Sequence, residues 1–444
     1  MKIIIAGAGE VGSHLAKMLS KENQDITLID SDQTKLDVID SNYNLMTWNG
    51  STSSFEDLRE IGIKEADLYI AVTPYETRNL STCAIAKKMG AKKTVARIDN
   101  SEFLIPENRQ IIREMGIDFV IYPEQLAAID IANSLSHNWS RYWGELHNGE
   151  LLLIGVKIHD NSVLLNVKLK DLPVTSHDFH IAAIKRKNET IIPNGNDEIL
   201  PDDVVYFITT PPFVDHVREL CGKKKRAIKK ALIMGGGRIA RRFAELFNDK
   251  FHIKILDTNM SICEQLATEL PNCEIVYGDG RDIEVLRENN IYQYDAFLAL
   301  TDSSETNILT CLTAKEFGVP KTIAEVENLQ FLGLAENLNI GNTVNKKLLA
   351  SSRIYKILLD ADESDSRFFV LSDAEVAEIY VRPGAKITKG PVKSLRLPFG
   401  MTLAALVRDS EVMLVNGNTQ IREGDYVVVF SLMGTLQKIE KWFN

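Results

Sequence analysis

The first part of the chain alternates short aliphatic runs with stretches of helical periodicity. KIIIAG is followed by HLAKML, DITLID by TKLDVI, and ADLYIAV by LSTCAIAKKMG. Runs rich in β-branched residues predict strands, and apolar positions spaced by three or four residues predict helices. Strands and helices that alternate in this way predict β-α-β units and a parallel sheet with helices on its faces.

The next stretch is built from short apolar runs that lack helices between them. LLLIGVKI, FHIAAIKR, ETIIP and DVVYFIT are separated by turn-forming residues such as Pro193-Asn194-Gly195. Short strands joined by turns predict a small mixed α+β domain. Between the two pieces, PEQLAAIDIANSL begins with a proline in its first turn and has helical periodicity, which predicts a helix that links them.

The whole arrangement occurs twice. The glycine-rich turn at Gly7 recurs at Gly235, and the same spacing places ADLYIAVT on YDAFLALT and TVARIDN on TIAEVEN. A slightly shorter spacing, that from Asp203 to Asp425, places FHIAAIKR on MTLAALVR and PDDVVYF on EGDYVVV. This agreement predicts two tandem copies, each with a Rossmann-like parallel-sheet domain followed by a small α+β domain.

The domain boundaries follow from these two repeat spacings. We predict a Rossmann-like nucleotide-binding domain at 1–122, a crossover helix at 123–140, an α+β domain at 141–222, a basic linker at 223–230, a second Rossmann-like domain at 231–360 and a second α+β domain at 361–444. The linker follows a helical ending and precedes a new strand, so a solvated connection is favoured over a contact with anionic lipid.

Composition and charge narrow the class of protein. At 444 residues the chain exceeds what one core fills, which predicts two to four domains. A net charge of −10 with 45% hydrophobic residues is typical of an acidic globular protein and argues against a nucleic-acid partner. No apolar run is long enough for a membrane span, and the amino terminus enters a strand at once. We therefore expect neither a membrane span nor a signal peptide.

Cysteine and histidine offer little chemistry. The five cysteines form no C-x-x-C pair, which favours a reducing cytosol and argues against zinc. Cys83 and Cys311 lie on equivalent apolar helices, so we expect both to be buried. His177 and His180 in SHDFH have no matching pair in the second half, and we expect them in a surface loop. We predict no metal site.

The first glycine turn carries the signature of nucleotide binding. Gly7, Gly9 and Gly12 follow an aliphatic strand and open a helix, and Asp30 ends the next strand. In this fingerprint the first glycine permits the tight turn, the second lets the backbone approach a pyrophosphate, and the third lets helix pack on strand. The helix amino end attracts the phosphates. Asp30 would accept ribose hydroxyls and repel a 2′-phosphate, which favours NAD(H) or an adenine nucleotide over NADP.

The second copy keeps this fingerprint. Its turn contains Gly235 and Gly237, and Asp257 again ends the following strand. Arg238 lies where the first turn has Glu10, so its guanidinium would be able to fork onto a phosphate.

Other positions distinguish the two copies. Arg97, a candidate phosphate clamp, corresponds to Glu325, so the second site would use Arg238 or Arg281 and differ in ligand preference. The turns WNGSTSS and YGDGRD come after the third strand, and Thr73 and Thr301 come after the fourth, at the sheet edge where ligands bind in such folds. Turn formation alone explains these strand-end residues equally well.

The predicted nucleotide-binding residues share a place on the glycine turns or at the strand ends. Those of the first half are Gly7, Ala8, Gly9, Glu10, Val11, Gly12, Asp30, Asn49, Ser51, Thr52, Thr73, Pro74 and Arg97. Those of the second half are Gly235, Gly236, Gly237, Arg238, Ile239, Asp257, Asp279, Gly280, Arg281, Thr301 and Asp302.

A regulatory function fits the pattern better than catalysis. A dehydrogenase needs an acid or base beside the nicotinamide, whereas the small repeated domains share no histidine or lysine for that role. We therefore expect no catalytic residues. An NAD-dependent oxidoreductase of unknown substrate and a nucleotide-binding scaffold that assembles without gating are the alternatives.

The doubled glycine turns, the acidic strand ends, the NGS and GDGR turns and the segments PDDVVYF and EGDYVVVF resemble the RCK (regulator of potassium conductance) family in its two-copy form. The resemblance covers essentially the whole chain. It implies a cytoplasmic regulatory subunit, peripheral on the cytoplasmic face of the inner membrane, that binds NAD(H) or ATP/ADP. It also implies self-association into a ring, expected to be a homotetramer, that gates potassium uptake through a membrane-embedded Trk-type potassium-transporting subunit.

Overall fold

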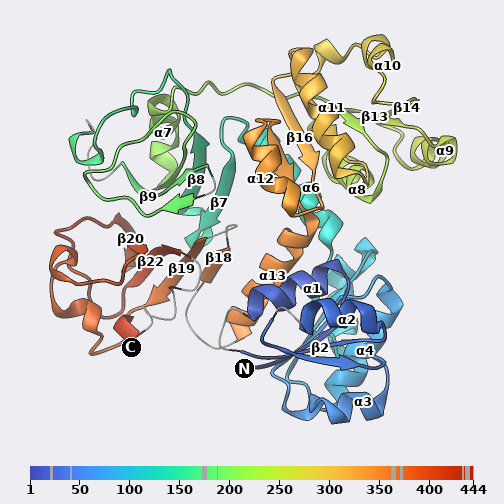
Figure 1. Ribbon diagram of the computed structural model, residues 1–444, viewed down its shortest axis with the longest axis horizontal. Helices are drawn as coiled ribbons and strands as arrows, with labels where there is room; N and C mark the ends of the chain where they lie inside the picture. The colour runs from blue at the N-terminus through green and yellow to red at the C-terminus, as the bar shows by residue number, and fades with distance from the viewer. Residues whose placement is uncertain are drawn as a thin grey trace. The chain divides into compact units, whose positions relative to one another are not determined.

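The computed structural model describes residues 1–20, 24–40, 43–172, 178–187, 189–361, 367–370, 374–432, 435 and 441–443 (Figure 1). Contacts divide the chain into two compact units, Met1–Ala127 with Asn345–Glu363, and Ala128–Val344 with Ser364–Asn444. Within the described ranges, no helix has both the length and the apolar character that crossing a bilayer requires.

The first unit contains a six-stranded parallel sheet in the order β3-β2-β1-β4-β5-β6. Strand order reverses between β1 and β4, and ligands bind at such switch points in doubly wound folds. Its elements are β1 (Lys2–Ala6), α1 (Glu10–Leu19), β2 (Asp25–Asp30), α2 (Gln33–Asp40), β3 (Met46–Asn49), α3 (Phe55–Glu60), β4 (Leu68–Ala71), α4 (Glu76–Met89), β5 (Lys93–Arg97), α5 (Arg109–Glu114) and β6 (Phe119–Ile121).

Apolar burial explains why β1 is central. Ile3, Ile4 and Ile5 are fully buried, as expected for a parallel strand covered on both faces. On one face Ile4 joins a core with Cys83 of α4 and residues of α3 and α5. Cys83 and its counterpart Cys311 are both buried, as predicted.

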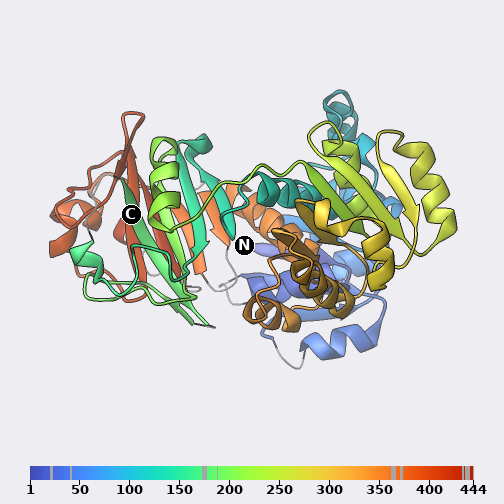
Figure 2. The same cartoon turned by 90° about the horizontal axis from the view of Figure 1, so that it is seen from above.

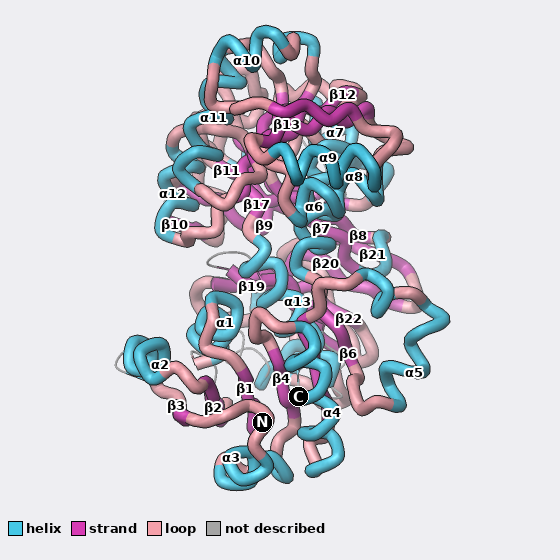
Figure 3. Tube along the Cα trace, turned by 90° about the vertical axis from the view of Figure 1, so that its right-hand side faces the viewer, coloured by secondary structure: helices cyan, strands magenta, loops and turns pink. Residues whose placement is uncertain are grey.

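The second unit contains an equivalent parallel sheet in the order β14-β13-β12-β15-β16-β17, with α8 and α9 alongside β12 and β13 (Figure 3). The elements are β12 (Lys230–Met234), α8 (Arg238–Phe247), β13 (His252–Asp257), α9 (Met260–Glu269), β14 (Glu274–Tyr277), α10 (Ile283–Glu288), β15 (Ala296–Ala299), α11 (Ser304–Glu316), β16 (Lys321–Glu325), α12 (Gln330–Asn337) and β17 (Asn342–Val344). The predicted pair of Rossmann-like sheets is therefore confirmed.

Two helices break the simple order of the repeats. Helix α6 (Pro123–Ser136) begins in the first unit and continues into the second. Helix α13 (Lys346–Ala361) follows the second parallel sheet in sequence but belongs to the first unit, where it packs against α1 (Figure 1). The repeat found in the sequence and the packing units therefore differ at these two helices.

Each copy also has a five-stranded antiparallel sheet in the second unit, with orders β10-β9-β11-β8-β7 and β18-β19-β22-β20-β21. The first consists of β7 (Tyr142–Leu146), β8 (Leu151–Lys157), β9 (Phe179–Arg186), β10 (Glu189–Ile191) and β11 (Val204–Thr209), followed by α7 (Val214–Leu220). The second consists of β18 (Arg367–Val370), β19 (Ala374–Tyr380), β20 (Met401–Arg408), β21 (Glu411–Leu414) and β22 (Tyr426–Leu432). These sheets confirm the small domains expected after each Rossmann-like sheet.

A repeated ion pair shows how closely the small domains correspond. In the first, Arg186 donates to both oxygens of Asp203 at 3.0 and 2.8 Å. In the second, Arg408 donates to Asp425 at 2.8 and 2.7 Å. Arg408 follows Arg186 at the same spacing as Asp425 follows Asp203, so the ion pair obeys the repeat found in the sequence.

The two antiparallel sheets pack face to face and share one apolar core (Figure 2). His180 lies on β9 at this interface, with Nδ1 3.3 Å from the carbonyl oxygen of Val415 and Nε2 3.1 Å from the hydroxyl of Thr402. The expectation of a surface loop is therefore wrong for His180, because β9 begins at Phe179 and His180 packs against Thr402 and Val415 of the second small domain. His177 lies outside the described residues.

Acidification is expected to weaken this interface. Burial lowers the pKa of His180 to about 4, whereas an unfolded histidine titrates at about 6.5. The unfolded chain therefore takes up the proton first, and stability falls as the pH drops from about 6.5 toward 4, by roughly 2–3 kcal/mol from this group. Denaturant midpoints measured from pH 7 to pH 4.5 should fall more steeply for the natural chain than for His180→Gln. Equal slopes would contradict this assignment.

Candidate nucleotide-binding sites

The first glycine turn has the geometry of a phosphate-binding loop. Gly7 has a φ of +110°, and a Cβ there would lie 3.1 Å from the backbone nitrogen of Thr73. A Cβ at Gly12 would overlap the Gly7 carbonyl group, so the helix packs closely on the turn. A Cβ at Gly9 would meet no atom within 4 Å. The turn is closed on the protein side and open at Gly9.

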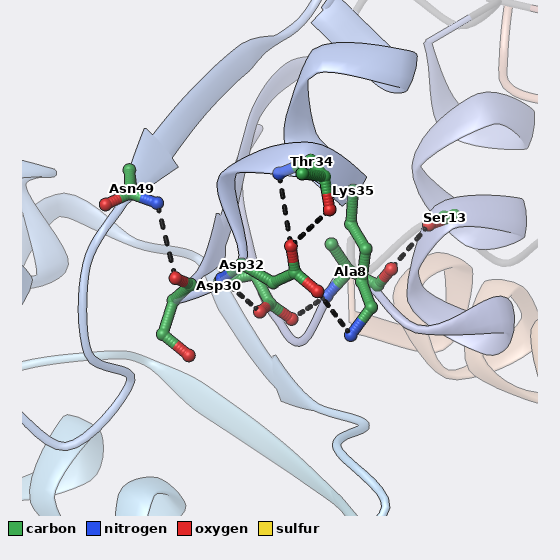
Figure 4. A network of polar contacts seen from close by, with 8 residues as sticks. Ala8, Ser13, Asp30, Asp32, Thr34, Lys35 and Asn49 are labelled. Atoms are coloured by element: carbon green, nitrogen blue, oxygen red, sulfur yellow. Dashed lines mark hydrogen bonds and ion pairs between the residues drawn. The ribbon is translucent and has the colours of Figure 1, made fainter.

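Asp30, at the end of β2, holds this turn in place (Figure 4). Its Oδ2 accepts from the backbone N–H of Ala8 at 2.6 Å, and its Oδ1 accepts from the N–H of Asp32 at 2.9 Å. Each carboxylate oxygen keeps a second lone pair. Asp30 is therefore able to accept hydrogen bonds from ribose hydroxyls while it holds the loop.

Lys35 is a neighbour of Asp30 that the motif did not identify. Its ammonium lies 3.2 Å from Oδ2 of Asp32 (Figure 4), and Asp32, followed by Asp30, raises the pKa of Lys35. The second copy has no lysine at the equivalent position. A comparison of the two copies that looked for differences, and not only for shared residues, would therefore have identified Lys35.

Asn79 organises the strand ends beside the turn. Its Oδ1 accepts from the N–H and the hydroxyl of Thr73 at 2.9 and 2.7 Å. Its Nδ2 donates to the carbonyl oxygens of Thr73 and Arg97, both at 2.9 Å. Asn79 is completely buried. The same spacing that relates the two glycine turns places Asn307 at the equivalent position of the second copy, but this spacing does not predict that the side chain ties β4 to β5.

The remaining strand-end residues of the first copy differ in their surroundings. Asn49 lies at the end of β3 and donates to the carbonyl of Ser31 at 3.4 Å. The N–H of Ser51 donates to Asp57 at 2.9 Å, a bond that lowers the pKa of the Asp57 carboxyl. Thr52 is buried, whereas Pro74 is exposed.

Two charged residues that were predicted to contact a nucleotide form ion pairs within the first unit. Glu10, at the first turn of α1, forms an ion pair with Lys347 of α13 at 2.6 Å. The guanidinium of Arg97 lies 3.7 Å from the carboxylate of Glu124, which is 2% exposed. The side chain of Val11 is buried, so any contact it makes with a ligand would come from its backbone.

The second turn repeats the arrangement of the first. Gly235 has a φ of +98°, and a Cβ at Gly237 would have only the Leu300 carbonyl oxygen within 4 Å, at 3.8 Å. Oδ2 of Asp257 accepts from the N–H of Gly236 at 2.6 Å. Asn307 accepts from the N–H of Thr301 at 3.1 Å and donates to the carbonyl of Glu325 at 2.9 Å. The same bonds therefore build both turns.

The surroundings of the second turn carry different charges. Glu325 is 4% exposed where the first copy has Arg97. Arg281, predicted as a phosphate ligand, donates to Asp279 at 2.7 Å, and this bond lowers the pKa of the Asp279 carboxyl. Arg238 is exposed at the start of α8, and Asp302 is exposed after β15. The side chain of Ile239 is buried, and Gly280 lies against Met234.

Each turn fits the adenosine diphosphate part of a dinucleotide. The fit rests on the open side of Gly9 and Gly237, the helix that begins at each turn, and the carboxylates of Asp30 and Asp257. In the part of the chain that the structure describes, no cluster of three or more His, Cys, Asp or Glu residues has the geometry to hold a metal ion.

Comparison with known proteins identifies both kinds of domain. A family model described as the TrkA-N domain matches residues 3–123 and 231–346, and one described as the TrkA-C domain matches residues 153–222 and 376–444. The "Trk system potassium uptake protein TrkA homolog" of Archaeoglobus fulgidus is 30% identical over 450 residues, covering 100% of both chains.

Solved structures show the same fold. The "Crystal Structure of the GsuK RCK domain" aligns with a TM-score of 0.60 at 16% identity, covering 100% of this chain and 94% of that chain. The "GsuK channel bound to NAD" aligns with a TM-score of 0.61 at 15% identity, covering 100% of this chain and 78% of that chain. The predicted resemblance to the RCK architecture is therefore confirmed.

Proposed function

Because the chain belongs to the TrkA family, we propose that it is a regulatory subunit that binds NAD(H) or adenine nucleotides and gates potassium uptake through a membrane-embedded Trk-type subunit. The observation that carries this proposal is the duplicated glycine turn with its strand-end carboxylate. Asp30 and Asp257 accept from the turn N–H groups of Ala8 and Gly236 at the same distance, 2.6 Å.

The choice of ligand follows from the carboxylate that would contact the ribose and from the glycine turn that would contact the phosphates. A carboxylate beside the ribose disfavours a 2′-phosphate, so NAD(H) is preferred to NADP. The turn and Asp30 or Asp257 contact only the adenosine diphosphate part, which ATP and ADP share with NAD(H). A solved structure of the same fold is described as bound to NAD. Since Glu325 replaces Arg97, we expect the two turns to rank these nucleotides differently.

A route for gating starts at the first turn. Helix α13 comes from the second half of the sequence, and its Lys347 pairs with Glu10, the first residue of the helix that would receive the phosphates. A nucleotide that shifts this helix end therefore acts on a segment that leads into the second small domain. Nucleotide binding would then favour one arrangement of the chain by about 1–3 kcal/mol per site.

The proposed function also includes self-association. We expect the chain to form a ring, as a homotetramer, on the cytoplasmic face of the inner membrane beneath its potassium-transporting partner. Two covalently joined copies close such a ring with fewer separate pieces. Because each ring would hold several nucleotide sites, small coupling energies at single sites add up to a large bias on the partner's gate.

Ion flux tests this function. The full chain is added to its potassium-transporting partner in proteoliposomes, with NADH, NAD, ATP or ADP at saturating concentration. At least one nucleotide should change potassium flux by about fivefold or more, since about 1–3 kcal/mol corresponds to about 5–150-fold. NADH should not be oxidised, which separates regulation from an oxidoreductase activity.

A matched pair of variants links flux to the site. Asp30→Ala, combined with Asp257→Ala, should abolish the nucleotide response. Asp25→Ala changes the same residue type at the exposed opposite end of β2 and should leave the response intact. Potassium flux that stays the same with every nucleotide would overturn the proposal.

A further inference from the structure

A basic cavity of about 530 Å³ lies in the second unit, away from the glycine turn of that unit. It is lined by Lys321 at the start of β16 and Asn342 at the start of β17, by Lys315 near the end of α11, and by residues of the first small domain. All strands of this parallel sheet end at the opposite edge, where Gly235 and Asp257 lie. The cavity is therefore separate from the predicted nucleotide site.

The lining is rich in cations and contains no acid. Its basic residues are Arg141, Lys157, His159, Lys223, Lys224, Arg226, Lys315 and Lys321. None of the described residues that line it is an aspartate or glutamate. The carboxylate of Asp202, outside the lining, pairs with Lys157 at 3.0 Å. Positive charge is therefore concentrated in one concave space.

The deepest cations are held in place by neutral oxygen atoms. Lys321 is 6% exposed, and its Nζ lies 3.1 Å from Oδ1 of Asn342. Arg141 donates to Oδ1 of Asn339 at 2.6 Å and to the carbonyl oxygen of Gly341. Such acceptors orient a cation without cancelling its charge. The groups are positioned in advance for an anion, as in other binding sites built on rigid elements.

Burial and mutual repulsion weaken the charges of these groups in the free protein. Burial, followed by Arg141, lowers the pKa of Lys321 to about 7, although Asp130 opposes the shift. Burial lowers the pKa of Lys223 to about 8, with Arg141 and Lys157 adding to it. A bound anion would reverse both effects, because an opposite charge stabilises the protonated lysine. An anion that binds here would therefore raise the pKa values of Lys321 and Lys223 and favour their charged forms.

The basic linker is part of this cavity. Lys223, Lys224 and Arg226 lie in the segment expected from the sequence to be only a solvated connection. The side chain of Asn138 donates to the carbonyl oxygen of Arg226 at 2.6 Å, which fixes the linker at the rim.

We propose that this cavity binds a small molecule that carries two or more phosphate groups. Guanidinium and ammonium groups are the usual partners of phosphate oxygens, and a cavity of this size exceeds the needs of a single phosphate. A free phosphorylated compound and an anionic lipid headgroup share this chemistry. The depth of Lys321 favours the free compound, because a headgroup at a bilayer surface would reach the linker lysines first. The site is independent of the glycine turns.

Calorimetry with inorganic tripolyphosphate tests the site in the full chain at fixed salt concentration. The titration uses chains with Gly9→Val and Gly237→Val, whose added side chains occupy the open side of each glycine turn, and we expect one strong site per chain. Adding Lys223→Gln and Lys224→Gln should weaken this affinity at least tenfold. The matched control adds Lys225→Gln and Lys229→Gln, which remove two exposed linker charges that do not line the cavity, and should change the affinity less than twofold.

Further measurements separate the alternatives. Lys321→Met keeps the side-chain length and should also weaken tripolyphosphate binding at least tenfold. NADH binding, measured in a chain with both glycine turns intact, should stay unchanged. Equal weakening by both linker pairs, or no tripolyphosphate binding, would overturn the proposal. So would binding to phosphatidylglycerol vesicles that requires Lys223 and Lys224 and that tripolyphosphate does not displace, since that result would assign the site to a lipid surface.

Discussion

Asn79→Ala is expected to destabilise the first parallel-sheet lobe by about 3–5 kcal/mol, because two buried backbone groups and one partly buried one lose their partner. These groups are the N–H and the carbonyl of Thr73 and the carbonyl of Arg97. Backbone amides of β4 and β5 should exchange hydrogen about 10³-fold faster, as followed by mass spectrometry of peptides from this lobe. Asn307→Ala should have the same effect on the second lobe.

The control for this prediction is Ser81→Ala. Ser81 lies on the same helix but is exposed, and its hydroxyl donates to the carbonyl of Arg78 within that helix. Its loss should change stability by no more than about 0.5 kcal/mol. If Asn79→Ala exchanged no faster than Ser81→Ala, the tie between β4 and β5 would not stabilise this lobe.

Gly9→Val is expected to reduce NAD(H) affinity at the first turn at least 100-fold while leaving the lobe folded. The backbone at Gly9 is extended, with φ −72° and ψ −174°, so valine is compatible with it. Beyond Gly9 and its two chain neighbours, no protein atom lies within 4 Å of the added Cβ, which therefore occupies the space through which a pyrophosphate would approach. Calorimetry gives the affinity, and the melting temperature reports the fold.

The matched change at Gly12 should differ from Gly9→Val in its effect on the fold. A Cβ at Gly12 clashes with the backbone of Gly7, so Gly12→Val should lower the melting temperature as well as the affinity. Unchanged NAD(H) binding in Gly9→Val, in a chain whose melting temperature is unaltered, would mean that phosphates do not approach the turn from this side.

Much of the fold could be predicted from the sequence because local patterns repeat. Aliphatic runs such as KIIIAG form central strands in both copies, since a parallel strand must be apolar on both faces. The second register of the repeat correctly placed Asp203 and Asp425 at equivalent positions, and each accepts from an arginine. The glycine turns were placed correctly because each needs positive φ at Gly7 or Gly235.

The parts that could not be predicted depend on contacts between distant segments. Helical periodicity shows that α13 has an apolar face, but it does not show which sheet this face covers. The basic cavity joins Arg141, Lys223 and Lys321, and sequence spacing gives no sign that they meet. The ion pair of Arg281 with Asp279 likewise depends on side-chain conformation.

Calorimetric titration of the full chain with NADH, NAD, ADP and ATP tests the central claim most directly. The account predicts two nucleotides bound at the glycine turns of each chain, one lost in Asp30→Ala and the other in Asp257→Ala, with Asp25→Ala behaving like the natural chain. Absence of binding with all four nucleotides, or two sites that persist in the doubly substituted chain, would contradict it.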